Sequence, residues 1–485
     1  MSIASLILSP WTALAASEFY YLYPYFFTYS QFRDIPGPLL ARLSNVWLFA
    51  TARRGKRFLL VHEAHQNYGP VMRIQPNHIS INNDEAIQAI YGHGNGFLKA
   101  DFYDAFVSIR RGLFNTRSRA EHSRKRKIVS NTFSAKSIVQ FEPYIHHNLE
   151  LFVQKWDELA ARAATTSPDG AVHVDCLNWF NYIAFDVIGD LAFGAPFGML
   201  ESGADMAEVR ASPDSPPVYA AAVEILNRRG EVGLAAVKDL AGIAIARVRR
   251  RLDAPPPPDR KDLLARLMEG RDDMGEPLGR EELTAEALTQ LIAGSDTTSN
   301  TSCALLYHVV RTPGVVAKLQ AELDAAVPAD VPVPTFDQVK ELPYLQAVIN
   351  ETMRHHSTSG IGLPRLVPLD SAGVEILGRF YPPGTVLSVP TYSVHHSKEI
   401  WGPDADEFKP ERWHNVTERQ KNAFIPFSYG PRACIGRNVA DMELKLIVAA
   451  WVRRYDVVLR QDAMETREGF LRKPVALEIG FKRRQ

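Results

Sequence analysis

Cysteine is scarce in this sequence. Only three cysteines, Cys176, Cys303 and Cys434, occur among 485 residues. A small secreted domain held together by disulfide bonds is therefore excluded, and a reducing, cytosol-facing compartment is favoured. For Cys176 and Cys303 we expect buried, small hydrophobic side chains. Cys434 lies in a different setting, a loop that also contains two glycines and an arginine.

The sequence also lacks a net charge and a nucleotide-binding loop. Lysine plus arginine and aspartate plus glutamate number 55 each, so the formal net charge is +0 and no overall field gathers nucleic acid. The single dense basic run, residues 117–127, is typical of a solvated helix face, and we expect no nucleic acid partner. No Gly-x-Gly-x-x-Gly segment follows a predicted strand, so nothing indicates a nicotinamide or flavin site within the chain.

Charge is nearly absent from residues 1–32, where Glu18 is the only charged residue and Leu, Ile, Ala, Phe and Tyr predominate. This composition predicts an N-terminal membrane anchor with an aromatic belt. Pro10 and Pro24 interrupt the segment, which leaves an interfacial segment as the alternative to a full span. Basic residues follow the segment, and by the positive-inside rule they keep residues 33–485, the expected single domain, on the cytoplasmic side.

Helical patterns dominate the rest of the chain. Apolar residues recur with helical spacing in residues 142–164 and in a long segment that ends before Pro313. Two short runs, residues 71–81 and 374–390, are typical of strands separated by turns. The sequence therefore predicts a mainly α fold with small β-sheets.

The longest predicted helix has a polar centre, "GSDTTSNTS", residues 294–302. A glycine, an acid and several hydroxyl groups stand where a core helix would carry apolar residues. One interpretation is a kinked helix whose hydroxyls bond to the preceding turn. The other is a ligand groove that crosses the helix at Gly294, Thr297 and Thr298, which share one face.

The cysteine loop, "FSYGPRACIGRNVA", has what a metal-ligating thiolate requires, namely amide donors, positive potential and close backbone approach. Gly430 and Gly436 let the backbone pass close to a flat ligand. A helix begins after the loop, and its positive end would face the sulfur of Cys434. Arg432 can bind an anionic group of a cofactor, and Phe427 can shield the sulfur from water.

The spacing of these five residues resembles the haem-ligating signature Phe-x-x-Gly-x-Arg-x-Cys-x-Gly of the cytochrome P450 family, and every fixed position matches. The resemblance covers the chain from Pro36 onward. It implies the cytochrome P450 fold, with haem b between a long central helix and the cysteine loop. It also implies that Cys434 is the axial thiolate ligand of the haem iron.

Two further segments resemble the family and occur in the expected order. Glu351 and Arg354 in "ETMR" match the Glu-x-x-Arg motif, and Arg412 in "PERW" matches an arginine that joins this pair. The resemblance implies a buried structural ion network of the three residues. Taken alone, each motif would predict no more than a surface ion pair worth about 0.3 kcal/mol.

The polar centre of the long helix, "AGSDTT", is similar to the oxygen-binding groove of the family. The resemblance implies that Gly294 leaves room for dioxygen. It also implies that Asp296 and Thr297 deliver the protons that oxygen activation requires.

The resemblance also implies which residues bind the haem propionates and which protein supplies electrons. Arg126, Arg365 and Arg432 match positions that bind the haem propionates. His122 replaces a tryptophan found in many relatives, and histidine can still donate a hydrogen bond to a propionate. The rest of the basic run would form a docking face for an acidic electron donor. We expect this donor to be NADPH-cytochrome P450 reductase, at the endoplasmic reticulum membrane, with the catalytic domain facing the cytoplasm.

Within the family, residues 89–137 and the segment "STSGIGLPR" resemble the fungal benzoate para-hydroxylases. This implies a monooxygenase that uses O2 and NADPH-derived electrons to convert benzoate, a small aromatic acid, to 4-hydroxybenzoate. Arg110 or Arg111 could bind the substrate carboxylate, with Thr358 and Ser359 as hydroxyl donors.

Three alternatives remain from the sequence. The first is a monooxygenase of the same family that acts on another aromatic or lipophilic substrate. The second is an isomerase or peroxygenase that needs no reductase, against which Asp296 and Thr297 argue. The third is a haem-binding protein without activity, because after residues 225–233 the chain is shorter than the family pattern, in a region that roofs the substrate channel.

Overall fold

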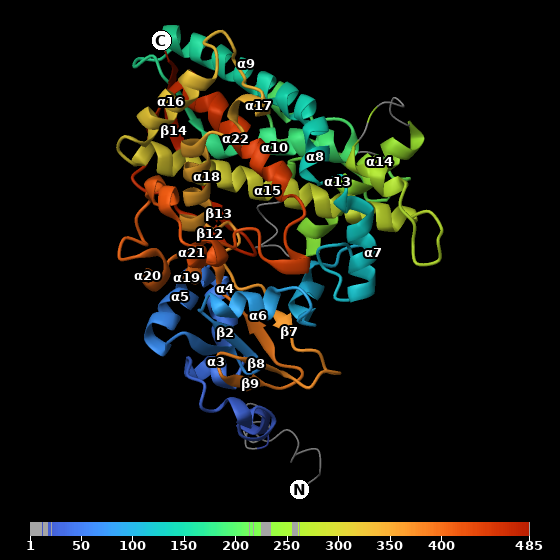
Figure 1. Ribbon diagram of the computed structural model, residues 1–485. Helices are drawn as coiled ribbons and strands as arrows, with labels where there is room; N and C mark the ends of the chain where they lie inside the picture. Colours follow the sequence, from blue (N-terminus) through green and yellow to red (C-terminus); the bar gives the residue numbers. More distant parts are fainter. Residues whose placement is uncertain are drawn as a thin grey trace.

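Figure 1 shows the computed structural model, which describes residues 12, 18–20, 22–212, 214–216, 218–224, 234–254, 260 and 262–484. The predicted shortening after residues 225–233 falls outside the described residues, as do residues 1–11, 13–17 and 21 of the predicted anchor. Within the described ranges, no helix combines the length and the apolar composition that crossing a membrane requires.

Helices fill the upper part of the molecule in Figure 1 and carry most of the core. The longest are α9 (Glu142–Thr166), α10 (Cys176–Phe193), α13 (Leu234–Asp253), α15 (Arg280–Arg311), α18 (Pro343–His355) and α22 (Arg437–Arg454). Helix α15 runs through the middle and packs against α10, α13, α18 and α22. Because neighbours surround it, α15 buries residues on several faces and lacks a single apolar stripe.

Shorter helices surround this group. They are α3 (Leu39–Leu43), α4 (Val46–Arg53), α5 (Arg57–Tyr68), α6 (Glu85–Tyr91), α7 (Arg119–Ser130), α8 (Ala135–Ile138), α11 (Met199–Ser202), α14 (Leu263–Met268), α16 (Val315–Ala326), α17 (Phe336–Val339), α19 (Thr391–His395), α20 (Lys398–Trp401) and α21 (Glu418–Ala423). Tighter helical turns that matter for the site are η3 (Asp101–Phe106), η5 (Pro410–Asn415) and η6 (Gly430–Arg432).

The largest sheet lies in the lower part of Figure 1, near the N-terminal elements. Its strand order is β1 (Val71–Gln75), β2 (His78–Ile81), β10 (Val386–Ser388), β7 (Arg365–Leu366) and β3 (Leu98–Lys99). Strands β2 and β10 are parallel and the other neighbours are antiparallel. In the pairing of β3 with β7, Lys99 lies opposite Arg365, so two cationic residues from distant segments become neighbours.

Smaller sheets complete the fold. They are formed by β11 (Tyr455–Leu459) with β14 (Glu478–Arg483) and β4 (Val172–Asp175), by β5 (Ala207–Val209) with β6 (Val218–Ala220), by β8 (Val374–Ile376) with β9 (Arg379–Tyr381), and by β12 (Thr466–Glu468) with β13 (Arg472–Pro474). Strand β13 packs against α15. The β12–β13 hairpin therefore reaches the central helix from a distant part of the sequence.

The predicted fold class, mainly α with small β-sheets, is confirmed. Residues 142–164 lie within α9, and the long helix ends at Arg311, before Pro313. The two strand-like runs also form strands, β1 and β2 in the first and β8, β9 and β10 in the second.

The polar centre of α15 is continuous helix. The hydroxyls of Ser295, Thr297 and Thr301 each donate to the carbonyl oxygen four residues earlier, at 2.7, 2.7 and 2.8 Å. The interpretation that these hydroxyls bond to the preceding turn is therefore confirmed. Helix α15 is not interrupted at this segment. The same segment also lines a cavity, so the two interpretations hold together.

Candidate active site

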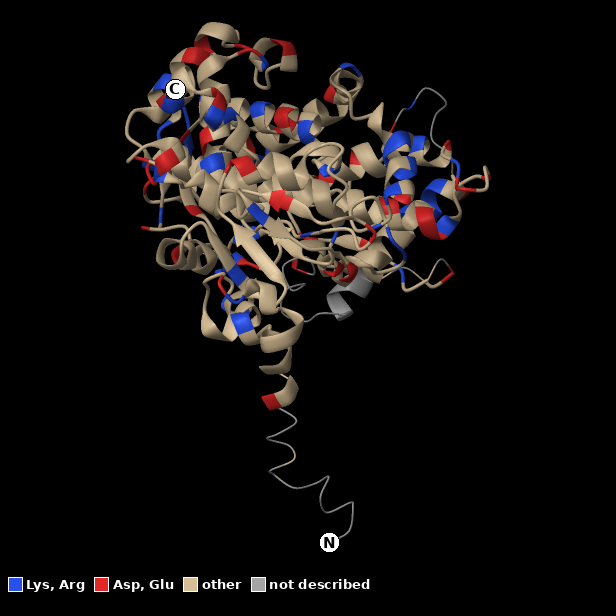
Figure 2. Ribbon diagram, turned by 60° about the horizontal axis from the view of Figure 1, so that its bottom comes forward, with Lys and Arg blue, Asp and Glu red and all other residues tan. Residues whose placement is uncertain are grey.

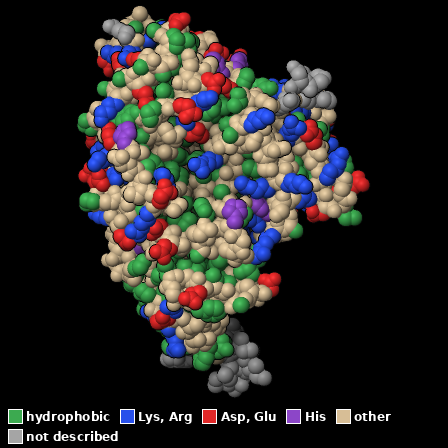
Figure 3. Space-filling view, in the orientation of Figure 1, with side chains coloured by type: hydrophobic (Ala, Val, Ile, Leu, Met, Phe, Trp, Pro, Cys, Tyr) green, Lys and Arg blue, Asp and Glu red, His purple; other side chains and the backbone are tan. Residues whose placement is uncertain are grey.

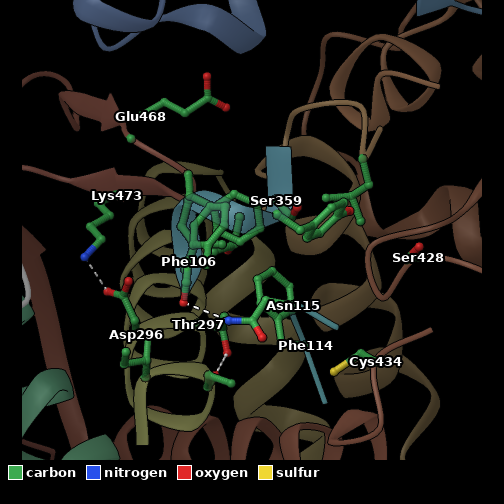
Figure 4. A pocket seen from close by; sticks show the side chains of 18 of the residues that line it. Phe106, Phe114, Asn115, Asp296, Thr297, Ser359, Ser428, Cys434, Glu468 and Lys473 are labelled. Atoms are coloured by element: carbon green, nitrogen blue, oxygen red, sulfur yellow. Dashed lines mark hydrogen bonds and ion pairs between the residues drawn. The ribbon is translucent and has the colours of Figure 1, made fainter. Parts of the chain in front are cut away.

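A cavity of about 1240 Å³ lies between α15, the cysteine loop, η3 and the β12–β13 hairpin. Six of the residues predicted to bind haem or to deliver protons line it, namely Asp296, Thr297, Arg365, Phe427, Arg432 and Cys434. Figure 4 shows Asp296 and Thr297 on the ribbon of α15 and Cys434 on the other side of the cavity. The structure thus brings together side chains that lie far apart in the sequence.

The cysteine loop is folded by local contacts. The Cys434 amide donates to the Phe427 carbonyl oxygen at 2.9 Å, and Gly436 directly precedes α22. Burial raises the pKa of the Cys434 thiol, while the Gly436 amide and the charge of Arg126 act to lower it. Cys434 is nevertheless exposed, because the cavity opens onto it. The loop therefore supplies donors and access for a metal ligand, and a bound cation would provide the remaining stabilisation of a thiolate.

Gly430 is not among the residues that line the cavity. Its φ is 70°, in the left-handed region that favours glycine, and a Cβ there would collide with the Tyr91 carbonyl oxygen of α6. The glycine is required because the loop passes tightly against α6. Gly436 is likewise absent from the cavity lining, and a Cβ there would meet the Cys434 sulfur at an ordinary 3.9 Å.

Four cations, which we call the cation cluster, gather at one end of the cavity: Lys99, Arg126, Arg365 and Arg432. Lys99, Arg365 and Arg432 line the cavity. Within the part of the chain that the structure describes, no carboxylate forms an ion pair with any of them. Their hydrogen bonds go to neutral acceptors, for example Arg126 to the Ala433 carbonyl at 2.9 Å and Arg432 to the Thr116 carbonyl at 3.0 Å.

The cation cluster perturbs its own members and its neighbour His122. Burial, followed by the charges of Arg432 and Arg126, lowers the pKa of His122 to about 3. Burial and the charge of Arg365 lower the pKa of Arg432 to about 10. Such crowded, buried positive charge is favourable only beside an anion. A group with two carboxylates, as haem has, fits these residues.

Lys99 was missed by sequence reasoning. It is buried, and burial together with the charges of Arg365 and Arg432 lowers its pKa well below the usual value. Its position depends on the pairing of β3 with β7. A two-residue strand carries no pattern that reveals this pairing.

Asp296 and Thr297 occupy different environments on α15. Thr297 is half-buried and donates to the Ala293 carbonyl oxygen at 2.7 Å. Asp296 is buried and forms an ion pair with Lys473 of β13, with an N–O distance of 2.8 Å (Figure 4). The sequence gave no sign of Lys473, because it reaches Asp296 only through the packing of β13 on α15.

Gly294 lies against α10 and is not among the residues that line the cavity. A Cβ at this position would lie 2.6 Å from Cδ1 of Ile188 on α10. The glycine therefore permits close packing of α15 on α10, and the space it leaves is filled by Ile188. Ala293 and Thr297 line the cavity instead.

Three phenylalanines line one part of the cavity together. We call Phe106, Phe114 and Phe470 the aromatic wall. Their ring centroids lie 4.9 to 5.6 Å apart, all with edge-to-face geometry. The Asn115 side chain stiffens this wall, because it donates to the Phe106 carbonyl at 2.8 Å (Figure 4). It also accepts from the Gly112 amide at 2.7 Å. The sequence analysis predicted neither the contacts among these three rings nor the presence of Phe470 in the cavity wall.

Of the residues considered for binding the substrate carboxylate, some line the cavity and others do not. Arg110 lines the cavity, but its guanidinium lies 3.4 Å from the Glu282 carboxylate. Arg111 does not line the cavity and pairs with Asp104. Thr358 and Ser359 line the cavity, and the Thr358 hydroxyl shares a hydrogen bond with that of Thr301 at 3.0 Å.

The basic run is only partly available as a surface. Lys125 is buried and pairs with Glu286 of α15 at 2.9 Å, and Arg124 pairs with Glu282 at 2.8 Å. These cations hold α7 to α15 and are not free for a partner. Arg119 and Lys127 of α7 remain exposed.

Glu351, Arg354 and Arg412 form one ion network. Arg354 donates to both carboxylate oxygens of Glu351 at 2.8 Å, and Arg412 donates to one of them at 3.0 Å. Burial works to raise the pKa of Glu351, but the bonds and charges of Arg354 and Arg412 outweigh it and hold the pKa below its usual value. Arg354 also donates to the Ala405 carbonyl at 2.7 Å. The network therefore ties α18 to the chain that precedes the cysteine loop.

These observations define the class of protein. A family model described as cytochrome P450 matches residues 36–481, and the chain belongs to the cytochrome P450 family. A crystal structure of a cytochrome P450 (CYP102L1) shares the fold, with a TM-score of 0.73 and 21% sequence identity, over 88% of this chain and 94% of that chain.

Among known proteins, the chain is similar to the benzoate 4-monooxygenase bphA of Aspergillus niger, at 59% identity over 99% of both chains. It is 31% identical to the cytochrome P450 monooxygenase gsfF of Penicillium aethiopicum over 88% of both chains. It is 30% identical to the pisatin demethylase of Fusarium vanettenii, over 95% of this chain and 92% of that protein. The alignment with bphA extends over 513 residues, more than the 485 of this chain. That relative therefore has positions without a counterpart here.

Membership of this family means that the chain is a haem protein whose iron is bound by a cysteine thiolate. Cys434 alone of the three cysteines lines the cavity. Cys176 and Cys303 are buried in the hydrophobic core, as expected.

Proposed function

We propose that this chain is a monooxygenase that inserts one atom of O2 into benzoate at the para position and so forms 4-hydroxybenzoate. The observation that carries the substrate is the 59% identity to the Aspergillus niger benzoate 4-monooxygenase over 99% of both chains. The aromatic wall supports it, because edge-to-face phenylalanines offer a flat aromatic ring a well-matched surface.

In this proposal Cys434 is the thiolate ligand, and the cation cluster with His122 faces the two haem propionates. The buried positive charge without a carboxylate partner in the described residues supports this orientation. Bound haem supplies the oxygen-activating chemistry. The protein side chains orient the substrate, move protons and exclude water.

Asp296 and Thr297 are the proposed proton-delivering residues. The Thr297 hydroxyl lies in the cavity wall, where its proton can be offered to a ligand without leaving the helix. Asp296 directly precedes Thr297 and forms an ion pair with Lys473, whose side chain is 21% exposed. The proposal assigns Asp296 and Lys473 the supply of protons to the cavity, which both residues line together with Thr297.

Thr297→Ala tests this role. The variant is expected to bind benzoate as the wild type does and to consume NADPH with added reductase. We expect the fraction of electrons recovered in 4-hydroxybenzoate to fall about tenfold, with hydrogen peroxide formed instead. Thr301→Ala, one turn away on the same helix, is the matched control. Unchanged coupling in Thr297→Ala would contradict the proposal.

The electron donor is proposed to be NADPH-cytochrome P450 reductase. The absence of a glycine-rich dinucleotide motif from the sequence supports an external donor. The exposed cations Arg119 and Lys127 of α7 support docking of an acidic surface, since Arg126 of the same helix contacts the cysteine loop.

The location is proposed to be the endoplasmic reticulum membrane, with residues 1–32 as the anchor and residues 33–485 as one catalytic domain facing the cytoplasm. The N-terminal elements expose large apolar side chains, among them Phe19, Tyr20, Phe27, Leu39, Leu40 and Phe49. Figure 2 shows few charged residues on the N-terminal elements, and Figure 3 shows hydrophobic side chains toward the lower end of the molecule. An apolar face beside an anchor supports contact with lipid.

The test of the function is an optical titration of the haem-loaded protein with benzoate, followed by turnover with NADPH and reductase. A saturable change of the haem spectrum and formation of 4-hydroxybenzoate are expected. A spectral change without this product would favour another aromatic substrate. A haem-loaded protein that neither binds benzoate nor oxidises any aromatic acid would instead be a haem-binding protein whose shortened region has removed the pocket.

A further inference from the structure

The ion pair between Lys473 and Asp296 places a buried carboxylate and a lysine ammonium in the cavity wall. The proposed proton delivery by Asp296 does not explain why a lysine is paired with it. Asp296 is 5% exposed, so its carboxylate is largely removed from water. A second carboxylate brought close to it would be repelled strongly, because charges interact more strongly in a poorly solvated interior. An enzyme for an aromatic acid must therefore neutralise Asp296 or keep the acid away from it.

Lys473 has the position and the donors for this task. It extends from β13 to the cavity wall, and its ammonium lies 2.8 Å from the Asp296 carboxylate. An ammonium has three N–H donors, and Asp296 is its one ion-pair partner among the residues that the structure describes. Because Lys473 also lines the cavity, its other donors can serve a ligand there.

Lys473 also lies at the correct end of the cavity for para-hydroxylation. Figure 4 shows Lys473 and Cys434 on opposite sides, with Thr297 between them. In benzoate the carboxylate and C4 lie at opposite ends of the ring. A carboxylate held at Lys473 therefore directs C4 toward the side on which Cys434 lies.

The other cations that line the cavity are less suited. Arg53 and Arg467 are exposed to water, where a single ion pair contributes little. Arg110 already faces Glu282 at 3.4 Å, and Arg57 faces the Glu468 carboxylate at 3.8 Å and donates to the Gly469 carbonyl. Lys99, Arg365 and Arg432 belong to the cation cluster, which the haem carboxylates would occupy.

We propose that Lys473 is a specificity-determining residue that binds the substrate carboxylate while it neutralises Asp296, so that the cavity admits aromatic acids in preference to neutral aromatic compounds. The inference rests on the proposed function and deepens it, because it names the residue that recognises the acid. One ammonium then bridges two carboxylates, and the proton-delivering residue and the substrate share one counter-ion.

The experiment compares benzoate with benzamide, its neutral analogue of similar shape, by optical titration of haem-loaded variants. Lys473→Gln is expected to weaken benzoate binding about tenfold or more, because a charge-assisted hydrogen bond is lost. Benzamide binding should change less than about twofold. Lys473→Arg should keep most of the preference for benzoate. Asp296→Asn should bind benzoate at least as tightly as the wild type, since a repelling charge is removed.

Two controls make the comparison decisive. Lys340→Gln removes a lysine that pairs with Asp337 at 2.8 Å on the surface, and it should leave both affinities unchanged. The carbonyl spectrum of the reduced protein and the melting temperature establish that each variant folds and holds haem. Arg110→Gln tests the competing anchor and is expected to leave the benzoate to benzamide ratio unchanged.

Several outcomes would overturn the inference. Equal weakening of benzoate and benzamide in Lys473→Gln would indicate a structural role for the ion pair. No weakening, or loss of the preference only in Arg110→Gln, would place the carboxylate elsewhere. A wild-type protein that shows no response to benzoate would overturn the proposed function and the inference together, and this result is distinct from a response without charge preference.

Discussion

The cysteine loop and the β12–β13 hairpin border the same cavity, but they are held in place in different ways. The turn that carries Cys434 is closed within the loop itself, by the bond from the Cys434 amide to the Phe427 carbonyl, and the Arg126 side chain of α7 contacts it. The hairpin is held by distant segments. The Glu468 amide donates to the Gly55 carbonyl at 2.6 Å, and the Glu468 carboxylate accepts from the Phe58 amide at 2.8 Å.

The difference separates two tasks. A loop whose turn is closed by its own main-chain bond keeps that turn when side chains elsewhere change. A hairpin held by tertiary contacts brings Phe470 and Lys473 to the cavity, so its contribution varies with its supports. We therefore expect substitutions elsewhere in the chain to change substrate binding more readily than haem binding.

The largest effect is expected on the loop side, from Cys434→Ser. The variant loses the thiolate, so the carbonyl spectrum typical of a haem thiolate and all turnover should disappear. Cys303→Ser, in the buried core, is the matched control. The folded fraction of this variant should retain the carbonyl spectrum and the turnover. A retained thiolate spectrum in Cys434→Ser would refute the assignment of the ligand.

A smaller effect is expected on the hairpin side, from Glu468→Ala. The change leaves the buried Phe58 amide without its acceptor and Arg57 without its ion-pair partner, a loss of about 2 kcal/mol of stability. We expect a lower midpoint in urea and weaker benzoate binding, with a normal carbonyl spectrum. Glu465→Ala, exposed just before the same hairpin, should change none of these. An altered haem spectrum in Glu468→Ala would show that the two sides are not independent.

Phe470→Ala is expected to have a milder effect on stability and a clear effect on substrate range. Removal of this half-buried ring opens the aromatic wall beside Phe106 and Phe114. Biphenyl-4-carboxylate, which we expect the wild type to exclude, should then produce a spectral change, and benzoate should bind about threefold more weakly. Phe380→Ala, at an exposed position on β9, is the control. Binding of the larger acid by the wild type would contradict the role of the wall.

The smallest expected effect is a difference in how the stability of the two regions depends on pH. His395 accepts from the Ile425 amide, near the start of the cysteine loop, and burial lowers its pKa to about 3. The unfolded chain then binds a proton near pH 6.5 that the folded protein does not, so this side loses stability as the pH falls below that value. Burial raises the pKa of Glu468 to about 7, so the folded protein binds the extra proton there and the hairpin side gains stability as the pH falls from 7 to about 4.5.

Urea midpoints measured between pH 7 and pH 5 test these opposite signs. The Glu468→Gln variant lacks the hairpin contribution, so its stability should fall more steeply on acidification than that of the wild type, by about 1 kcal/mol per pH unit at most. Parallel curves for the two proteins would contradict the raised pKa of Glu468.

The same division explains which features the sequence predicts. The five-position loop motif, the Glu351 network and the mainly helical fold follow from spacing within short segments or from helical period. Lys473, Lys99 and Phe470 join the site only through β13 on α15, β3 on β7 and the contact of the hairpin with η3. These pairings involve short strands, whose register no local pattern specifies. Gly294 and Gly430 were recognised as special, but for the wrong neighbours.

Those two glycines also differ in how evolution can treat them. Gly294 faces the side chain of Ile188, so a larger residue at one position can be compensated by a smaller residue at the other, and the two should vary together among related chains. Gly430 faces the main-chain carbonyl of Tyr91, which no substitution removes, and its φ of 70° disfavours other residues. The first glycine is one half of an exchangeable pair, whereas the second has no partner whose mutation could rescue its loss.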